Sequence, residues 1–173
     1  MNDLKRYIRD VRDFPRKGIV FKDITPLLLD AGALRDAVSS MSQRAPRPEA
    51  VVAIESRGFV FGTGLALQWQ VPLVLARKFG KLPGRTVREV YSLEYGEDTL
   101  EIHADALRPG QSVVVVDDLL ATGGTALASA RLVEQLKGRV LGTVFLIELV
   151  GLGGRERLGG YPVEALLQYE VRE

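Results

Sequence analysis

The sequence predicts a single α/β domain in which a central, mainly parallel β-sheet is flanked by helices. Short apolar runs, typical of strands buried on both faces, recur along the chain. Segments with helical spacing of apolar residues separate these runs, and polar or glycine-containing loops follow them. In such a sheet, ligands bind beyond the carboxyl ends of the strands. The expected strands cover residues 50–54, 71–76, 113–116 and 140–147.

Length and composition agree with one soluble domain. The chain has 173 residues, of which 46% are hydrophobic, enough for a sizeable core. No apolar stretch reaches transmembrane length or follows the charged residues 1–6, so we expect a cytoplasmic protein with no membrane partner. With no cysteine and one histidine, any metal should be Mg²⁺ on oxygen ligands. A net charge of +1 indicates no nucleic-acid partner.

Several helices are expected in the first part of the chain. Apolar residues at helical spacing predict an amphipathic helix over residues 4–11. Residues 13–18 contain proline and glycine and should end it. Pro26 can occupy the first position of the next helix. Longer helices are expected over residues 32–44 and 59–68.

The most informative stretch begins at the strand over residues 113–116. Asp117 and Asp118 follow it, and such a pair of rigid acceptors suits vicinal hydroxyl groups or a hard cation. A glycine loop comes next, and a helix should begin at Ala126 and end with Gly138 at its C-cap. Exposed backbone N–H groups, a helix N-terminus and flanking hydroxyl groups together predict a phosphate site. The predicted phosphate-site residues are Ala121, Thr122, Gly123, Gly124 and Thr125.

Two widespread nucleotide motifs do not describe this loop. A Walker loop needs a lysine just before its Ser or Thr, and no lysine lies between Lys81 and Lys137. The dinucleotide fingerprint G-x-G-x-x-G is also absent from it. The remaining alternative is an ordinary βα turn with solvated acids. Such turns seldom combine a buried strand, paired acids and a Thr-Gly-Gly-Thr loop.

The run Val-Val-Asp-Asp-Leu-Leu-Ala-Thr-Gly-Gly-Thr resembles the phosphoribosyl-diphosphate (PRPP) binding motif of type I phosphoribosyltransferases, in the form of their adenine-specific members. In that family the acids meet the ribose hydroxyls and the loop holds the 5′-phosphate. Five motifs match in family order over about residues 10–170. The resemblance implies the single-domain type I phosphoribosyltransferase fold, with an N-terminal hood over about residues 1–30 and a flexible lid over about residues 81–98.

The hood motif concerns the base. Phe-Pro-x-x-Gly-Ile-Val-Phe-Lys-Asp-Ile resembles the family's hood, which implies that Phe21 stacks on adenine and that Leu149 packs on the other face. Val20 is assigned to read adenine through its backbone, with C=O accepting from the amino group and N–H reaching N1. Lys22 is placed in the same site. The family often has arginine there, and lysine keeps the charge but loses the bidentate fork.

Basic residues follow two other strands. Arg57 lies at a strand's carboxyl end just before Gly58, which favours the ligand crevice over a solvated surface. The run from Arg77 to Arg88 contains five bases and no acid. Charge runs are usually solvated faces, but the glycines and proline here indicate a mobile cationic flap over a polyanion. By resemblance, the residues that reach the diphosphate are Ser56, Arg57, Arg77, Lys78 and Lys81.

The segment Tyr-Ser-Leu-Glu-Tyr-Gly at residues 91–96 predicts by itself only a hairpin arm with exposed tyrosines. It resembles the family's catalytic lid, which implies that Glu94 and Tyr95 close over the reacting centre. Arg57, which the family places near the base, completes the set of expected catalytic residues.

The remaining elements follow from patterning alone. Residues 99–104 alternate as a half-exposed strand with Glu101 and His103 on its polar side. Residues 151–154 only partly match a dinucleotide loop and are expected to form a turn. Residues 162–169 are expected to form an edge strand.

The resemblance implies adenine phosphoribosyltransferase activity in purine salvage, in which adenine and PRPP give AMP and diphosphate. Mg²⁺ is the implied cofactor, carried by PRPP, with Asp117 and Asp118 as candidate direct ligands. A homodimer is implied by resemblance alone. One alternative is a phosphoribosyltransferase for hypoxanthine, guanine, xanthine or orotate, against which the flanking motifs argue. The other is a non-catalytic PRPP-binding regulator, which should carry a DNA-binding domain or a broad basic patch.

Overall fold

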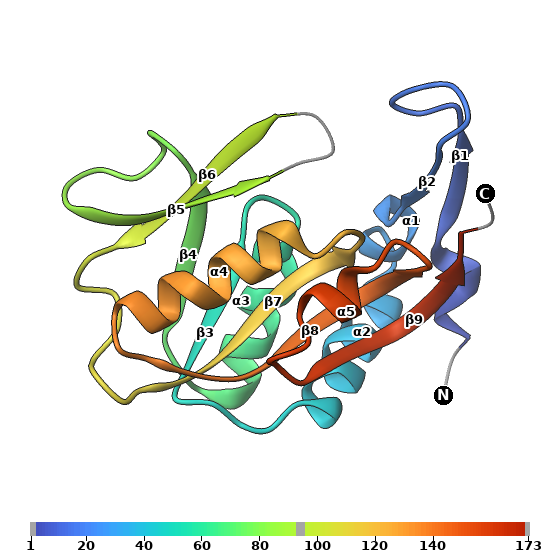
Figure 1. Cartoon of the computed structure of the whole chain (residues 1–173). Helices are drawn as coiled ribbons and strands as arrows, with labels where there is room; N and C mark the ends of the chain where they lie inside the picture. The colour runs from blue at the N-terminus through green and yellow to red at the C-terminus, as the bar shows by residue number, and fades with distance from the viewer. Residues whose placement is uncertain (1–2, 93–95, 172–173) are drawn as a thin grey trace.

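A seven-stranded sheet forms the centre of the molecule (Figure 1), in the order β5-β6-β4-β3-β7-β8-β9. The computed structural model describes residues 3–92 and 96–171. The five strands from β4 to β9 in this order run parallel, whereas β6 is antiparallel to both β4 and β5. The prediction of a mainly parallel sheet is confirmed. The strands are β3 (Ala50–Ile54), β4 (Leu73–Lys78), β5 (Thr86–Ser92), β6 (Glu97–His103), β7 (Ser112–Leu120), β8 (Arg139–Val150) and β9 (Val163–Glu170).

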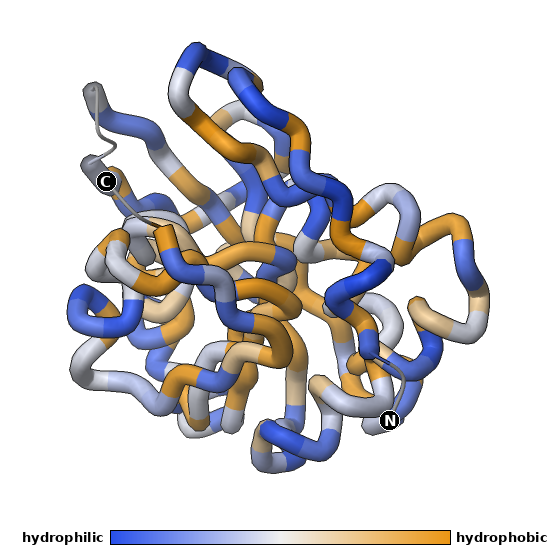
Figure 2. The backbone as a smooth tube through the Cα atoms, turned by 90° about the vertical axis from the view of Figure 1, so that its right-hand side faces the viewer, coloured by the Kyte–Doolittle hydropathy of each residue, from blue (hydrophilic) through white to orange (hydrophobic). Residues whose placement is uncertain are grey.

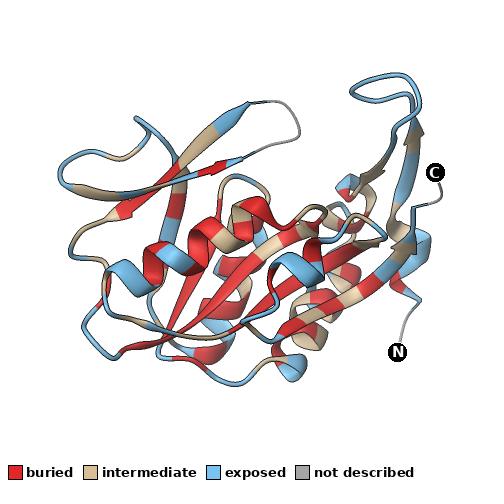
Figure 3. Cartoon of the chain, viewed as in Figure 1, coloured by how far each residue is buried: buried red, intermediate tan, exposed pale blue. Residues whose placement is uncertain are grey.

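Helices cover both faces of this sheet. On one face lie α2 (Ala31–Arg44) and α3 (Gly58–Trp69), and on the other lies α4 (Gly124–Gln135), as Figure 1 shows. Alternate residues of β7 face opposite ways, so that Val114 packs in the core under α2 and α3, while Val113 packs in the core under α4. This is why the run of four valines is wholly buried. Figure 3 shows the buried residues concentrated in the central strands and on the inward helix faces.

The N-terminal segment corrects one prediction. Instead of a helix over residues 4–11, a 3₁₀ turn η1 (Leu4–Tyr7) is followed by β1 (Arg9–Arg12), which pairs antiparallel with β2 (Val20–Asp23). A two-turn helix is marginal in water. Here the ladder supplies backbone partners, and Arg9 Nε donates to Asp23 Oδ2 at 3.0 Å. The short α1 (Thr25–Leu28) has its proline at the expected start.

Several boundaries also differ from expectation. β4 begins two residues later than predicted and ends at Lys78, because its ladder with β6 extends to that residue. β7 continues past Val116, so Asp117 and Asp118 lie within the strand rather than after it. At the end of α4 it is Lys137, not Gly138, that takes positive φ, 62°. Gly138 N–H instead closes the helix on the Val133 carbonyl at 2.9 Å.

Two hairpins project from the body on the same side, β1–β2 at one end and β5–β6 at the other (Figure 1). Hydrophilic residues predominate along the outer loops, whereas hydrophobic stretches run through the interior (Figure 2). Among the described residues, none of the helices combines the length and apolar character needed to cross a membrane.

Candidate active site

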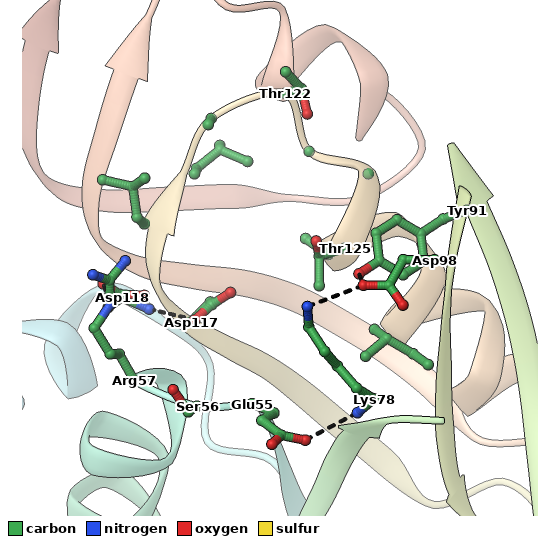
Figure 4. A pocket seen from close by; sticks show the side chains of 17 residues that line it. Glu55, Ser56, Arg57, Lys78, Tyr91, Asp98, Asp117, Asp118, Thr122 and Thr125 are labelled. Atoms are coloured by element: carbon green, nitrogen blue, oxygen red, sulfur yellow. Dashed lines mark hydrogen bonds and ion pairs between the residues drawn. The ribbon is translucent and has the colours of Figure 1, made fainter. Parts of the chain in front are cut away.

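A hollow of about 470 Å³, the central hollow, lies at the carboxyl ends of β3, β4 and β7. Parallel strands bring side chains from separate parts of the chain to this edge. Figure 4 shows acids, a cationic side chain and the glycine loop facing the same space. Its polar lining residues are Glu55, Ser56, Arg57, Lys78, Tyr91, Asp98, Asp117, Asp118, Thr122 and Thr125.

Asp117 and Asp118 form the acidic wall of the hollow. Asp118 is 4% exposed, and its Oδ2 lies 2.7 Å from Arg57 Nε. Arg57 thus holds this oxygen in an ion pair, and Asp118 Oδ2 accepts no further hydrogen bond among the described residues. Gly58 makes room for the pair, because a Cβ there would lie 2.8 Å from Asp117 Oδ1. A ligand hydroxyl can therefore find a free acceptor here.

Both carboxyl groups hold their protons more tightly than usual. Burial raises the pKa of Asp117 well above its ordinary value, and the charge of Asp118 raises it further. Burial also raises the pKa of Asp118, although Arg57 opposes the shift. A ligand that donates hydroxyl hydrogens or brings a cation would relieve this repulsion. Two adjacent carboxylates suit Mg²⁺, which keeps several waters and substrate oxygens beside one or two protein carboxylates.

The phosphate loop adopts the predicted strand–glycine loop–helix arrangement. Gly123 has φ of +76° and caps the start of α4, whose first residue is Gly124. The N-terminus of α4 therefore lies at the hollow, which Thr122, Gly123, Gly124 and Thr125 line. The arrangement offers an anion both hydrogen-bond donors and positive potential.

A second glycine segment supports this loop. A Cβ on Gly123 would lie 2.7 Å from the Gly154 carbonyl, and one on Gly154 would collide with the Ala121 carbonyl. Gly154, the last of the residues expected to form a turn, begins the one-turn α5 (Gly154–Arg157). Sequence analysis missed this supporting role, although three glycines among residues 151–154 were a signal of close backbone approach.

The five residues predicted to reach a diphosphate divide into two groups. Ser56, Arg57 and Lys78 line the hollow. Arg77 and Lys81 do not, and Arg77 instead donates from Nε and Nη2 to the Glu55 carboxylate at 3.2 and 3.1 Å. The Arg77 Nη1 group also donates to the Lys81 carbonyl at 3.1 Å, which ties the flap to β4.

Glu101 corrects the expectation of a polar, exposed strand face. It is 1% exposed, and one carboxylate oxygen accepts the N–H groups of Gly80, Lys81 and Leu82 at 3.0–3.2 Å. The other oxygen accepts the Thr86 hydroxyl at 3.0 Å. Burial alone would raise the pKa of Glu101, but these hydrogen bonds outweigh it and hold the pKa below its ordinary value. The cationic flap is thus built around a buried carboxylate.

Tyr91 and Asp98 complete the wall opposite the acids. Tyr91 is buried rather than exposed, and its hydroxyl donates to Asp98 Oδ2 at 3.2 Å. A Cβ on Gly124 would lie 3.4 Å from Tyr91 Cδ2, so the β5–β6 hairpin packs on the start of the phosphate loop. Local sequence offered no signal for either residue, because their roles depend on pairing across the hairpin.

The residues assigned to the base lie around the hollow rather than in its lining. Arg57 lies 5.0 Å from the ring centroid of Phe21, which links the β1–β2 hairpin to the acidic wall. Val20 is exposed, and Leu149 packs against the core under α2 and α3. Lys22 Nζ lies 2.7 Å from Asp10 Oδ1 and 4.4 Å from the Tyr169 ring centroid. These contacts engage its ammonium group outside the hollow.

The catalytic pair expected from the lid, Glu94 and Tyr95, falls outside the described residues. Arg57, the third expected catalytic residue, lies between Phe21 and Asp118 as given above. Among the described residues, no group of three or more His, Cys, Asp or Glu is placed to hold a metal ion.

A sequence profile of the phosphoribosyl transferase domain matches residues 28–159. The match covers most of the chain and includes the Asp pair, the phosphate loop and Arg57. The chain belongs to the phosphoribosyltransferase family. It is therefore related to glycosyltransferases of the pentosyl type, and the predicted family fold is confirmed.

Individual members of the phosphoribosyltransferase family resemble the chain over nearly its whole length. An adenine phosphoribosyltransferase of Desulfitobacterium hafniense is 53% identical over 169 residues, which cover 96% of this chain and 98% of the relative. A solved adenine phosphoribosyltransferase from Thermoanaerobacter pseudethanolicus has a TM-score of 0.92 at 49% identity, covering 96% and 98% of the chains. The Saccharomyces cerevisiae enzyme, solved with adenine and an imino-altritol bisphosphate, has a TM-score of 0.89 at 40% identity, covering 95% and 97%.

Proposed function

We propose that this phosphoribosyltransferase joins adenine to PRPP, forming AMP and diphosphate as a step of purine salvage. The observation that carries the proposal is the composition of the central hollow, where a phosphate loop, paired acids and cationic side chains line one cavity. PRPP presents the matching groups, a 5′-phosphate, two ribose hydroxyls and a diphosphate. The relatives named above add support, since they carry the adenine name at 40–53% identity.

The phosphate loop and the acids hold the sugar. The backbone N–H groups of residues 121–125 bind the 5′-phosphate, and Thr122 and Thr125 add hydroxyl donors. Asp117 and Asp118 accept hydrogen bonds from the two ribose hydroxyls, and Asp118 Oδ2, paired with Arg57, has a lone pair left for one of them. Because the 5′-phosphate and the ribose hydroxyls are both held, the anomeric carbon has one orientation toward the base.

The reaction itself is a displacement at the anomeric carbon. The bond from this carbon to the diphosphate oxygen breaks with its electron pair, and a bond to adenine N9 forms. Ser56, Arg57 and Lys78 stabilise the charge on the departing diphosphate. Glu94 and Tyr95 close over the centre and exclude water, which would otherwise hydrolyse the cation-like transition state.

Mg²⁺ is the proposed cofactor and enters with PRPP. When bound, Mg²⁺ shields the diphosphate charge and so favours departure of this group. Among the carboxylates that line the hollow, Asp117 and Asp118 are the proposed direct ligands.

Adenine is read by backbone groups in this proposal. The C=O group of Val20 accepts the 6-amino hydrogen and its N–H group reaches N1, while Phe21 and Leu149 enclose the ring. Lys22 adds positive charge nearby through its side chain. Hypoxanthine and guanine present a carbonyl and an N1–H group at these positions, so both backbone groups would lack partners. Unpaired buried polar groups of this kind can give discrimination of about 10⁴–10⁵.

A panel assay tests the proposal. The unmodified protein is supplied with Mg²⁺, PRPP and one base at a time, and diphosphate release is measured. We expect turnover with adenine to exceed that with hypoxanthine, guanine, xanthine or orotate by at least a hundredfold. Turnover of an oxopurine within tenfold of adenine would refute the specificity. If no base is turned over, the alternative of a non-catalytic PRPP-binding regulator would be favoured.

We also propose a cytoplasmic homodimer. Val60 and Leu67 of α3 and Leu75 of β4 are exposed apolar side chains that a second copy would cover. The absence of cysteine is in keeping with a reducing compartment.

A further inference from the structure

Asp98 places a carboxylate in the central hollow, on the wall where the diphosphate is proposed to lie. Its Oδ2 atom lies 3.1 Å from Lys78 Nζ and accepts the Tyr91 hydroxyl at 3.2 Å. Figure 4 shows these three side chains beside Thr125 of the phosphate loop. All four residues line the hollow.

The contacts hold the carboxylate more firmly than the lysine. Tyr91 and Asp98 are direct partners across the β5–β6 hairpin, and Tyr91 is 7% exposed. The Thr99 N–H group binds the other carboxylate oxygen at 2.8 Å. The side chain of Lys78 is 58% exposed and carries the long flexible stem of a lysine. Lys78 can therefore turn toward another anion while Asp98 stays in place.

A fixed carboxylate is unfavourable beside a polyanion, because like charges at short range repel. In the absence of substrate, the same carboxylate gives Lys78 a partner. The hydrogen bond from Lys78 to Asp98 is the main cause of the raised pKa of Lys78, so the carboxylate stabilises the charged ammonium group in the free hollow.

We propose that Asp98 is a positioning residue that stands in for the diphosphate, holding Lys78 in the free hollow until the diphosphate group displaces its carboxylate. The inference rests on the proposed function, in which Lys78 binds the diphosphate. Competition between the two anions weakens diphosphate binding and so speeds release of this product.

Binding of inorganic diphosphate with Mg²⁺, measured by titration calorimetry, tests the proposal. Asp98→Asn keeps the size of the side chain and removes the competing charge. We expect it to bind diphosphate about three- to tenfold more tightly than the unmodified protein, the range expected for a partly exposed ion pair plus lost repulsion. AMP affinity should change less than twofold, because the AMP phosphate occupies the loop of residues 121–125. A merely structural defect would weaken both ligands.

Three variants sharpen the test. Glu97→Gln removes the same charge from an exposed neighbour on β6 and should change diphosphate affinity less than twofold. Asp98→Ala removes the carboxylate without adding an amide and should tighten binding as Asp98→Asn does. In a Lys78→Met background, the effect of Asp98→Asn should become smaller, because no ammonium remains to be competed for.

Two outcomes are decisive against the inference. Unchanged or weaker diphosphate binding by both Asp98 variants, with binding by the unmodified protein intact, would overturn it alone. Failure of the unmodified protein to bind diphosphate or to form AMP would overturn the proposed function and this inference together.

Discussion

The charged form of Asp117 is unfavourable in the ligand-free protein, yet its carboxylate is proposed to bind the substrate. Burial and the charge of Asp118 raise its pKa, so the folded protein binds this proton more tightly than the unfolded chain does. Ionisation of Asp117 therefore lowers the free energy of unfolding as the pH rises above its ordinary pKa. Asp117→Asn keeps an oxygen to accept the Asp118 N–H group, now bonded at 2.8 Å, and removes the charge.

We therefore predict opposite effects of Asp117→Asn on stability and on activity. At pH 7 the free protein should unfold at a higher temperature, with a gain that shrinks as the pH falls and the native carboxyl becomes protonated. The KM for PRPP should rise about 10- to 150-fold, equivalent to a charge-assisted hydrogen bond of about 1.5–3 kcal/mol. Asp105→Asn, at an exposed site, is the control for net charge. A lower unfolding temperature and an unchanged KM would contradict both expectations.

At the scale of elements, the phosphate loop and the turn before α5 support each other through two glycines. Gly123→Ala should cost about 1–2 kcal/mol of unfolding free energy for its positive φ alone. The new Cβ must also displace the Gly154 carbonyl, so AMP binding should be lost. Gly110→Ala is the matched control, because Gly110 has φ of +79° and open space around its Cβ position. Calorimetry with AMP should find binding intact in the control, and equal binding in both variants would refute the close-approach argument.

The cationic flap between β4 and β5 depends on Glu101. Glu101→Gln removes the charge that four hydrogen bonds now share, and should cost the flap about 1.5–3 kcal/mol of local stability. We expect trypsin to cut after Lys81 or Arg85 at least about tenfold faster. Glu156→Gln, which removes an exposed carboxylate, should leave the rate unchanged.

The pH dependence of this protection follows from the lowered pKa of Glu101. The unfolded carboxyl binds a proton more readily than the folded one, so the stabilisation is fully present above the ordinary pKa of 4.5. It should be lost as the pH falls from that value through the lower folded pKa. Hydrogen exchange of the Gly80, Lys81 and Leu82 amides can follow the change. If the protection of these amides against exchange did not fall at low pH, contacts other than those of Glu101 would hold the flap.

At the scale of the whole molecule, the apolar side chains on α3 and β4 bear on self-association. Leu67 is 74% exposed at the rim of a hollow lined by residues of α3 and the start of β4. Leu67→Glu should shift the protein from dimer to monomer in sedimentation experiments, since a buried unpaired charge opposes association. Leu29→Glu, at the residue after α1 and with Leu29 83% exposed, should leave the dimer intact. A monomer at all concentrations in the unmodified protein would exclude the dimer proposal.

Sequence alone determined the features that depend on local pattern. The buried apolar runs and their alternation with helices predicted the sheet and its layers. The adjacent Asp-Asp and Thr-Gly-Gly-Thr motifs predicted the phosphate loop. The position of Arg57 at the end of a strand also placed it at the ligand edge, because parallel strands end together, whereas Lys78 was assigned by family resemblance. Each of these inferences uses residues that lie close together in the sequence or a general rule of sheet topology.

Tertiary structure decided the features that depend on distant partners. Residues 9–12 form a strand because β2 offers a ladder, and Glu101 is buried because the flap folds over it. Asp98 meets Lys78 from another strand, and Gly154 supports a loop some thirty residues earlier in the chain. Whether a polar side chain is solvated or buried depends on which groups the fold brings to it, since burial becomes favourable only when those groups satisfy its hydrogen bonds.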